Sequence, residues 1–142
     1  MNSILAATDG SEDADRAIDV AAALAKATAS KLLVMTVGHE LPGAEVRQLA
    51  RAEGGVGEAH DLVYMQLLQR AKARALSKGA PSVEEQLGWG EPGAALLDVA
   101  RRIGADFIVV GRRGRGKAAS LLLGSVSHRL VGEALCVVVV VP

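Results

Sequence analysis

The sequence predicts a single α/β domain over residues 1–142, with a five-stranded parallel sheet lying between two layers of helices. Short runs rich in Val, Leu and Ile alternate along the chain with segments of helical period. These runs are apolar at successive positions, which is typical of parallel strands covered on both faces. The length is typical of one domain, and we find no linker or internal repeat. Ligands of such folds bind at the carboxyl ends of the strands.

The first predicted strand covers residues 4–7 and is ended by the turn residues Thr8-Asp9-Gly10-Ser11. Ser11 has the chemistry of an N-cap, and Glu12 and Asp13 follow where the helix dipole favours negative charge. Apolar residues then recur at helical spacing to Ala25, and a second strand is predicted over 31–37, closed by Gly38.

The middle of the chain is less regular. Prolines and glycines interrupt residues 39–57, where a short helix is predicted over 44–52. Helical period returns at Glu58 and stops at Gly79 and Pro81. The predicted apolar face of this helix consists of Leu62, Met65, Leu68 and Ala75.

The second half repeats the alternation. A shorter strand is predicted over 82–87 and a loop over 88–92, in which Trp89 is expected to pack on the surface. Pro92 suits the start of the next helix and Gly104 its end. The remaining elements are a strand over 106–110, a helix around 121–134 and a last strand over 136–141.

Composition excludes several classes of protein. Sixteen Lys and Arg balance sixteen Asp and Glu, so no basic field favours nucleic acid or a membrane surface. A single cysteine, Cys136, excludes an intrachain disulfide. The first residues lack the pattern of a signal peptide, and the longest apolar run is too short for a membrane span, so we expect a cytoplasmic protein. His60 has no partner at metal-ligand spacing, and no metal site is expected.

A glycine-rich, basic segment follows the strand at 106–110. Gly111 and Gly114 allow backbone N–H groups to approach an anion, and Gly124-Ser125-Val126-Ser127 lies where the last helix is predicted to begin. The hydroxyls of Ser125 and Ser127 would add donors, so the spacing indicates a phosphate site. The alternative is structural: the glycines turn the chain, Ser125 is an N-cap and the arginines are solvated.

Residues 111–118 also match the spacing of a Walker A loop. The position that should carry Ser or Thr for magnesium is Ala118, and the segment does not follow the first strand. A P-loop ATPase is therefore not predicted.

These features together resemble the ATP-binding branch of the universal stress protein family. The phosphate motif of that branch, G-x2-G-x9-G-S, is present as Gly111, Gly114, Gly124 and Ser125. The segments ILAATDGSE, GEPGAALLDVARRIGADFIVVGRRGRG and GSVSHRLVGEALCVVVVV are also similar to the family. The resemblance implies a Rossmann-like sheet of order 3-2-1-4-5, as in the adenine nucleotide alpha hydrolases, and a regulatory, stress-response role.

The resemblance further implies a site for ATP, or for ADP or AMP, with or without Mg²⁺. Asp9 would contact the ribose, the backbone of Val37 would hold adenine, and Ala7, Thr8 and Val110 would line the site. The ribose and phosphates would be held by Gly111, Gly114, Gly124, Ser125, Val126 and Ser127. For Asp9, a role only as a turn residue or helix cap is the alternative.

The resemblance also implies a homodimer through the last strand, Val137, Val138, Val139, Val140 and Val141. Val137 stands where relatives commonly have proline, which leaves the geometry of strand pairing open. Two alternatives remain for function. One is a slow ATPase or self-phosphorylating protein, although no convincing carboxylate base is found near Ser125 and Ser127; the other is a nucleotide-free interaction module with an unknown protein partner.

Overall fold

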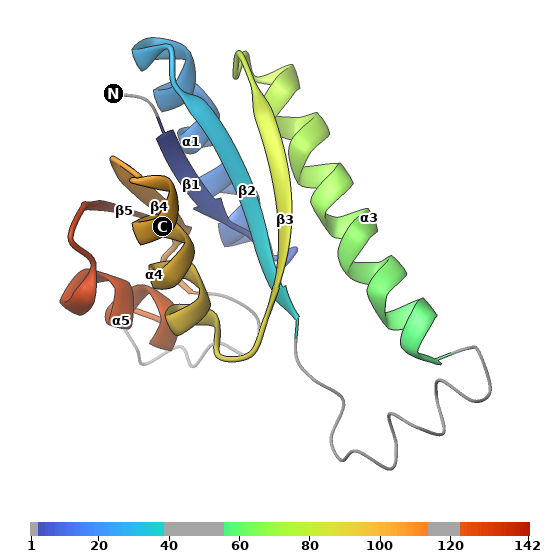
Figure 1. Cartoon of the computed structure of the whole chain (residues 1–142). Helices are drawn as coiled ribbons and strands as arrows, with labels where there is room; N and C mark the ends of the chain where they lie inside the picture. Colours follow the sequence, from blue (N-terminus) through green and yellow to red (C-terminus); the bar gives the residue numbers. More distant parts are fainter. Residues whose placement is uncertain (1–2, 39–55, 114–122) are drawn as a thin grey trace.

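A five-stranded parallel sheet of order β3-β2-β1-β4-β5 forms the centre of this computed structural model, which describes residues 3–38, 56–113 and 123–142 (Figure 1). The predicted fold class and strand order are confirmed. The strands are β1 Ser3–Ala7, β2 Lys31–Gly38, β3 Val83–Trp89, β4 Phe107–Gly111 and β5 Val137–Val141.

Four described helices connect and cover the strands: α1 Glu12–Thr28, α3 Val56–Ser77, α4 Pro92–Ile103 and α5 Ser125–Glu133. Figure 1 shows α1 and α3 on one face of the sheet and α4 and α5 on the other. The predicted helix signals are confirmed where they can be checked. Ser11 Oγ accepts a hydrogen bond from Ala14 N at 3.2 Å, Pro92 lies in the first turn of α4, and Gly104 ends α4 with φ 62°.

Successive strand residues alternate between two apolar layers, as a parallel sheet covered on both faces requires. In β1, Ile4 and Ala6 pack with α1 and α3, whereas Leu5 packs with α4 and α5. Small alanines on α1 let that helix approach the sheet closely: Ala17, Ala21 and Ala25 are fully buried. With only 2% aromatic residues, the core is built from close aliphatic contacts.

Two predictions about the middle of the chain are wrong. Strand β3 extends to Trp89, so Gly88 and Trp89 pair with β2 instead of forming a loop. On α3, Leu68 and Ala75 are buried as predicted, but Leu62 is 59% exposed and Met65 is 40% exposed. At 3.6 residues per turn, Leu62 lies about a third of a turn away from Leu68 and points off the sheet. The predicted helix over 44–52 lies outside the described residues.

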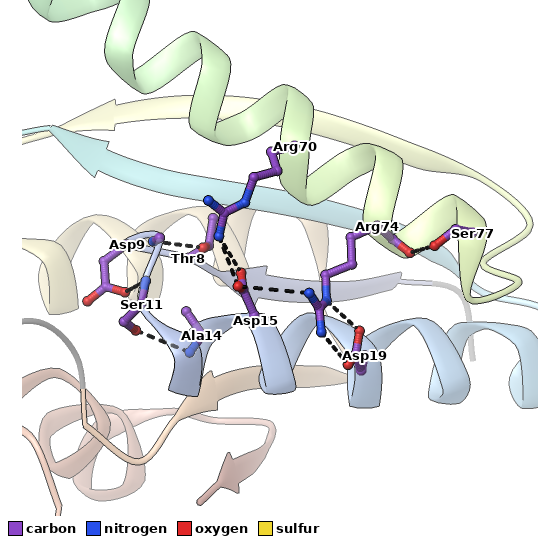
Figure 2. Close-up of polar contacts among 10 residues, drawn as sticks. Thr8, Asp9, Ser11, Ala14, Asp15, Asp19, Arg70, Arg74 and Ser77 are labelled. Carbon is purple, nitrogen blue, oxygen red and sulfur yellow. Dashed lines mark hydrogen bonds and ion pairs between the residues drawn. The ribbon is translucent and has the colours of Figure 1, made fainter.

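Two ion pairs join α1 to α3 on the outside of the sheet (Figure 2). Arg70 donates to both carboxylate oxygens of Asp15 at 3.1 and 2.9 Å, and Arg74 donates to those of Asp19 at 2.7 and 2.8 Å. The hydrogen bonds from Arg74 lower the pKa of Asp19. Arg70 and Arg74 are one turn apart on α3, and Asp15 and Asp19 are one turn apart on α1. The two pairs therefore set the register of α3 against α1.

Replacing Asp19 with asparagine should lower the free energy of unfolding at pH 7 by about 0.5–1 kcal/mol, the scale of a solvent-screened ion pair. A folded-state pKa below the unfolded value of about 3.9 stabilises the protein above that pH and loses its contribution as the pH falls through the folded pKa. Urea unfolding at pH 7 and pH 3 checks this. The difference between the two proteins should shrink at the lower pH, and Asp98→Asn, in the exposed pair with Arg102, should have a smaller effect. An equal difference at both pH values would contradict the assignment.

Candidate functional site

The turn after β1 holds Asp9 at the carboxyl edge of the sheet. Thr8 N donates to Met35 O of β2 at 2.9 Å, and Gly10 N donates to Thr8 Oγ1 at 3.1 Å. Ser11 N donates to Asp9 Oδ1 at 2.9 Å, and Gly10 supplies the positive φ of 81° that the turn needs. Figure 2 shows Asp9 in this turn, ahead of the first residues of α1. The capping role therefore belongs to Ser11, while the carboxylate of Asp9 is fixed two residues past the end of β1.

Gly111 ends β4 in close contact with the first turn of α1. A Cβ built at this position would lie 2.9 Å from the carbonyl carbon of Asp13 and 3.0 Å from its Cβ and carbonyl oxygen. The chain continues with Arg112 N donating to Val141 O at 2.7 Å. A glycine is thus required here by packing, whether or not a ligand is bound.

The start of α5 is built on the same segment. Gly124 is the N-cap, with an extended backbone (φ −71°, ψ 166°), and its N–H donates to Arg112 O at 2.7 Å. Ser127, 2% exposed, directs its hydroxyl at Arg112 O (2.9 Å) and Gly124 O (3.1 Å). The N-cap interpretation of Ser125 is wrong, because Ser125 is the first helical residue and is exposed. The hydroxyl of Ser127 donates to these backbone oxygens inside the protein. Only the backbone N–H of Ser127 is then available to a ligand at the start of the helix.

The helices that start at this edge differ in whether their first N–H groups are already capped. Helix α1 is capped by the Ser11 side chain and carries three acidic residues in its first turn. Helix α4 is capped by the carboxylate of Glu91, which accepts from Gly93 N at 3.0 Å and Ala94 N at 2.6 Å, and these bonds lower the pKa of Glu91. Helix α5 has neither a side-chain cap nor an acidic residue in its first turn. Of these three starts, α5 is the one whose N–H groups and dipole remain open to an anion.

Val37 lies two residues beyond the end of β1, since Ala7 pairs with Met35. Backbone groups alternate along a strand: Met35 O faces β1, where it accepts from Thr8 N, and Gly38 O faces β3, where it accepts from Gly90 N at 3.3 Å. The N–H and C=O of Val37 therefore point to the β1 side, above the end of that strand. A flat group with adjacent acceptor and donor atoms would match this pair.

The structure brings most of the predicted site residues to one edge of the sheet. The residues at this edge are Ala7 at the end of β1 with Thr8 and Asp9 directly after it, Val37 in the last two residues of β2, Val110 and Gly111 at the end of β4, and the N-cap Gly124 with Ser125, Val126 and Ser127 in the first turn of α5. Gly114 lies outside the described residues. Sequence reasoning missed Arg112, whose carbonyl joins Gly124 and Ser127, because a backbone role leaves no signal in residue type. It also missed the packing of Tyr64 and Trp89 on Gly38, since these residues meet only in the folded chain.

Within residues 3–38, 56–113 and 123–142, no group of three or more His, Cys, Asp or Glu side chains gathers as metal ligands would. No helix in this part of the chain combines the length and the apolar character that crossing a membrane requires.

Comparisons with known proteins agree in family and fold. The family model "Universal stress protein family" matches residues 1–142. A universal stress protein of Thermus aquaticus is 38% identical over 150 residues, covering 99% of this chain and 98% of that protein. A universal stress protein solved in complex with cAMP is 30% identical, with a TM-score of 0.75 over 99% of this chain and 96% of the other. UspA from Lactobacillus plantarum is 20% identical but superposes with a TM-score of 0.86 over 99% and 97% of the two chains.

Proposed function

Because the chain belongs to the universal stress protein family, we propose that it binds an adenine nucleotide, with ATP as the principal ligand, and acts as a nucleotide-dependent regulator of the stress response. The open N-terminus of α5 carries this proposal. It lies at the sheet edge that holds Asp9 and Val37, and a similar protein was solved with cAMP.

The phosphates would bind at the start of α5. The N–H groups of Ser125, Val126 and Ser127 have no acceptor within the helix, and the dipole adds positive potential there. Gly111 and Gly114 complete the motif, and Ser125 supplies an exposed hydroxyl. Mg²⁺ would be held mainly by the phosphates and water, as is usual for this ion, because the described residues offer no carboxylate cluster.

The nucleoside would extend along the sheet edge from β4 to β2. The carboxylate of Asp9 suits the ribose hydroxyls, and the backbone of Val37 presents the N–H and C=O pair that adenine matches with N1 and N6. Ala7, Thr8 and Val110 would form the adjoining walls. Binding without rapid turnover is favoured because the first turn of α5 carries no acidic side chain that would act as a base for an attacking hydroxyl or water.

The test is the nucleotide content of protein purified without added nucleotide. The protein is denatured, and the supernatant is resolved by anion-exchange chromatography at 260 nm. A near-stoichiometric ATP peak is expected. ADP or AMP in place of ATP would indicate hydrolysis and contradict a slow-turnover regulator, and no nucleotide together with no binding of Mg-ATP in calorimetry would reject the site.

Asp9→Ala should weaken the binding of ATP and of adenosine by similar factors of about tenfold, the worth of one hydrogen bond to a charged group. Tripolyphosphate, which lacks ribose and base, should bind as it does to the unaltered protein. Isothermal titration with the three ligands measures this, and Asp98→Asn, on the exposed face of α4, is the control. Unchanged adenosine affinity would show that Asp9 serves only the turn.

We also propose that the protein forms a homodimer through β5. This strand lies at the edge of the sheet, and the apolar residues around its start, Leu135 and Val137, are 95% and 54% exposed. An exposed valine strand with unpaired backbone groups favours pairing with a second copy. The side chain of Val139, by contrast, packs against the core layer below α1.

Val137→Glu should therefore shift the protein from dimer to monomer without unfolding it, whereas a charge at Val139 would also disturb the core. Light scattering across a concentration series measures the mass. Val131→Glu, on an equally exposed site of α5, is the control and should leave the mass unchanged. An unaltered dimer for Val137→Glu would reject pairing through this end of β5.

A further inference from the structure

Two aromatic rings from distant parts of the chain pack on the backbone of Gly38. Trp89 ends β3, where it pairs with Gly38, and Tyr64 reaches the same point from α3. A Cβ built on Gly38 would lie 2.6 Å from Trp89 Cζ3 and 2.9 Å from Tyr64 Cε2, so the rings fill the space of the missing side chain. The rings also contact each other edge to face, with centroids 5.7 Å apart and planes at 86°.

The contact lies one residue from the backbone that would hold the nucleobase. Val37 and Gly38 share a peptide bond, and their polar groups face opposite sides of β2: Gly38 towards β3 and Val37 towards β1. Strand β1 ends at Ala7, opposite Met35, so among the described residues no strand pairs with β2 at Val37 on this side. Glycine is also the most flexible residue, so position 38 alone would leave the Val37 backbone loosely placed.

We propose that Trp89 and Tyr64 form an aromatic clamp that positions the Val37 backbone and thereby sets the preference for adenine over guanine. This inference rests on the proposed nucleotide site. Adenine presents a donor at N6 beside an acceptor at N1, which matches the C=O and N–H of Val37. Guanine presents the reverse pattern, an acceptor at O6 and a donor at N1. A backbone held in one place accepts the first pattern and leaves buried groups unpaired with the second. Trp89 acts through Gly38, so it is a positioning residue and does not itself contact the base.

The sequence is consistent with this role. Trp89 is the only tryptophan in the chain, and it is 44% exposed, so its ring contributes less to the core than a buried tryptophan would. Gly38 and Trp89 are the last residues of β2 and β3, at the carboxyl edge of the sheet. Loss of the clamp should therefore change base recognition more than it changes stability.

The test measures dissociation constants for ATP, GTP and tripolyphosphate by isothermal titration. Trp89→Leu should reduce the ATP-to-GTP preference by about tenfold, the worth of one net hydrogen bond, with tripolyphosphate affinity unchanged. Trp89→Phe, which keeps a ring, should restore most of the preference. Leu76→Ala, at an exposed apolar site near the far end of α3, is the matched control and should retain it.

A second measurement uses the unaltered protein. Trp89 fluorescence should change on titration with adenosine and not with tripolyphosphate, because only the base meets the Val37 backbone. An unchanged ATP-to-GTP ratio in Trp89→Leu, an equal loss of ATP and tripolyphosphate, or adenosine binding without a fluorescence change would each overturn the clamp while leaving nucleotide binding intact. Failure of the unaltered protein to bind ATP or adenosine would overturn both proposals.

Discussion

Replacing Gly111 with alanine is expected to lower the free energy of unfolding by about 2 kcal/mol, within the range for forcing one extra group into a packed contact. The new Cβ would lie 2.9 Å from the backbone carbonyl carbon of Asp13, a distance that such atoms do not adopt. Backbone in the first turn of a helix cannot turn aside as a side chain can. The end of β4 and the start of α1 must therefore separate.

Urea or thermal unfolding measures this loss, and Gly132→Ala is the matched control. Gly132 is an exposed glycine in α5 with nothing within 4 Å of an added Cβ, so alanine there should stabilise the protein by about 0.5–1 kcal/mol through helix propensity. The same substitution is thus expected to change the free energy of unfolding in opposite directions at two glycines of the same chain. If Gly111→Ala were as stable as the unaltered protein, the close approach of β4 and α1 would be refuted.

Replacing Ser125 with proline should weaken ATP binding by about 10- to 100-fold, the worth of one hydrogen bond to a charged phosphate. Proline is well tolerated in the first position of a helix, because the N–H that it removes has no intrahelical partner. Gly124 already has the extended backbone, with ψ 166°, that a residue before proline requires. The change therefore removes one phosphate donor and one hydroxyl while α5 keeps its structure.

Ser125→Ala separates the two lost groups, since it removes the hydroxyl and keeps the N–H. Isothermal titration should show a small loss of ATP affinity for alanine, a large loss for proline and unchanged adenosine affinity for both. Thermal unfolding of both variants should match that of the unaltered protein. Unchanged ATP affinity in Ser125→Pro would show that the phosphates do not bind at the start of α5.

Much of the fold follows from local patterns in the sequence. Ser11, Pro92 and Gly104 mark helix ends through local backbone chemistry, and the structure confirms each of them. The double-sided apolar strands predicted the parallel sheet and its two helical layers, because each face of a strand must be buried. The resemblance supplied the strand order, which local pattern alone leaves open, and the structure confirms it.

The candidate site was predicted by residue type, and its geometry was decided by tertiary contacts. The spacing of Gly111, Gly124 and Ser125 indicated a phosphate site, but only the folded chain shows that Gly111 is needed against Asp13 and that the hydroxyl of Ser127 is bound internally to Arg112 O. The predicted burial of Leu62 and Met65 on α3 and the predicted loop at Trp89 were wrong, because both depend on which neighbours the edge strand β3 meets. Contacts such as those of Tyr64 and Trp89 with Gly38 join residues far apart in the chain. Local sequence patterns carry no information on which distant residues meet, so only the tertiary structure decides these contacts.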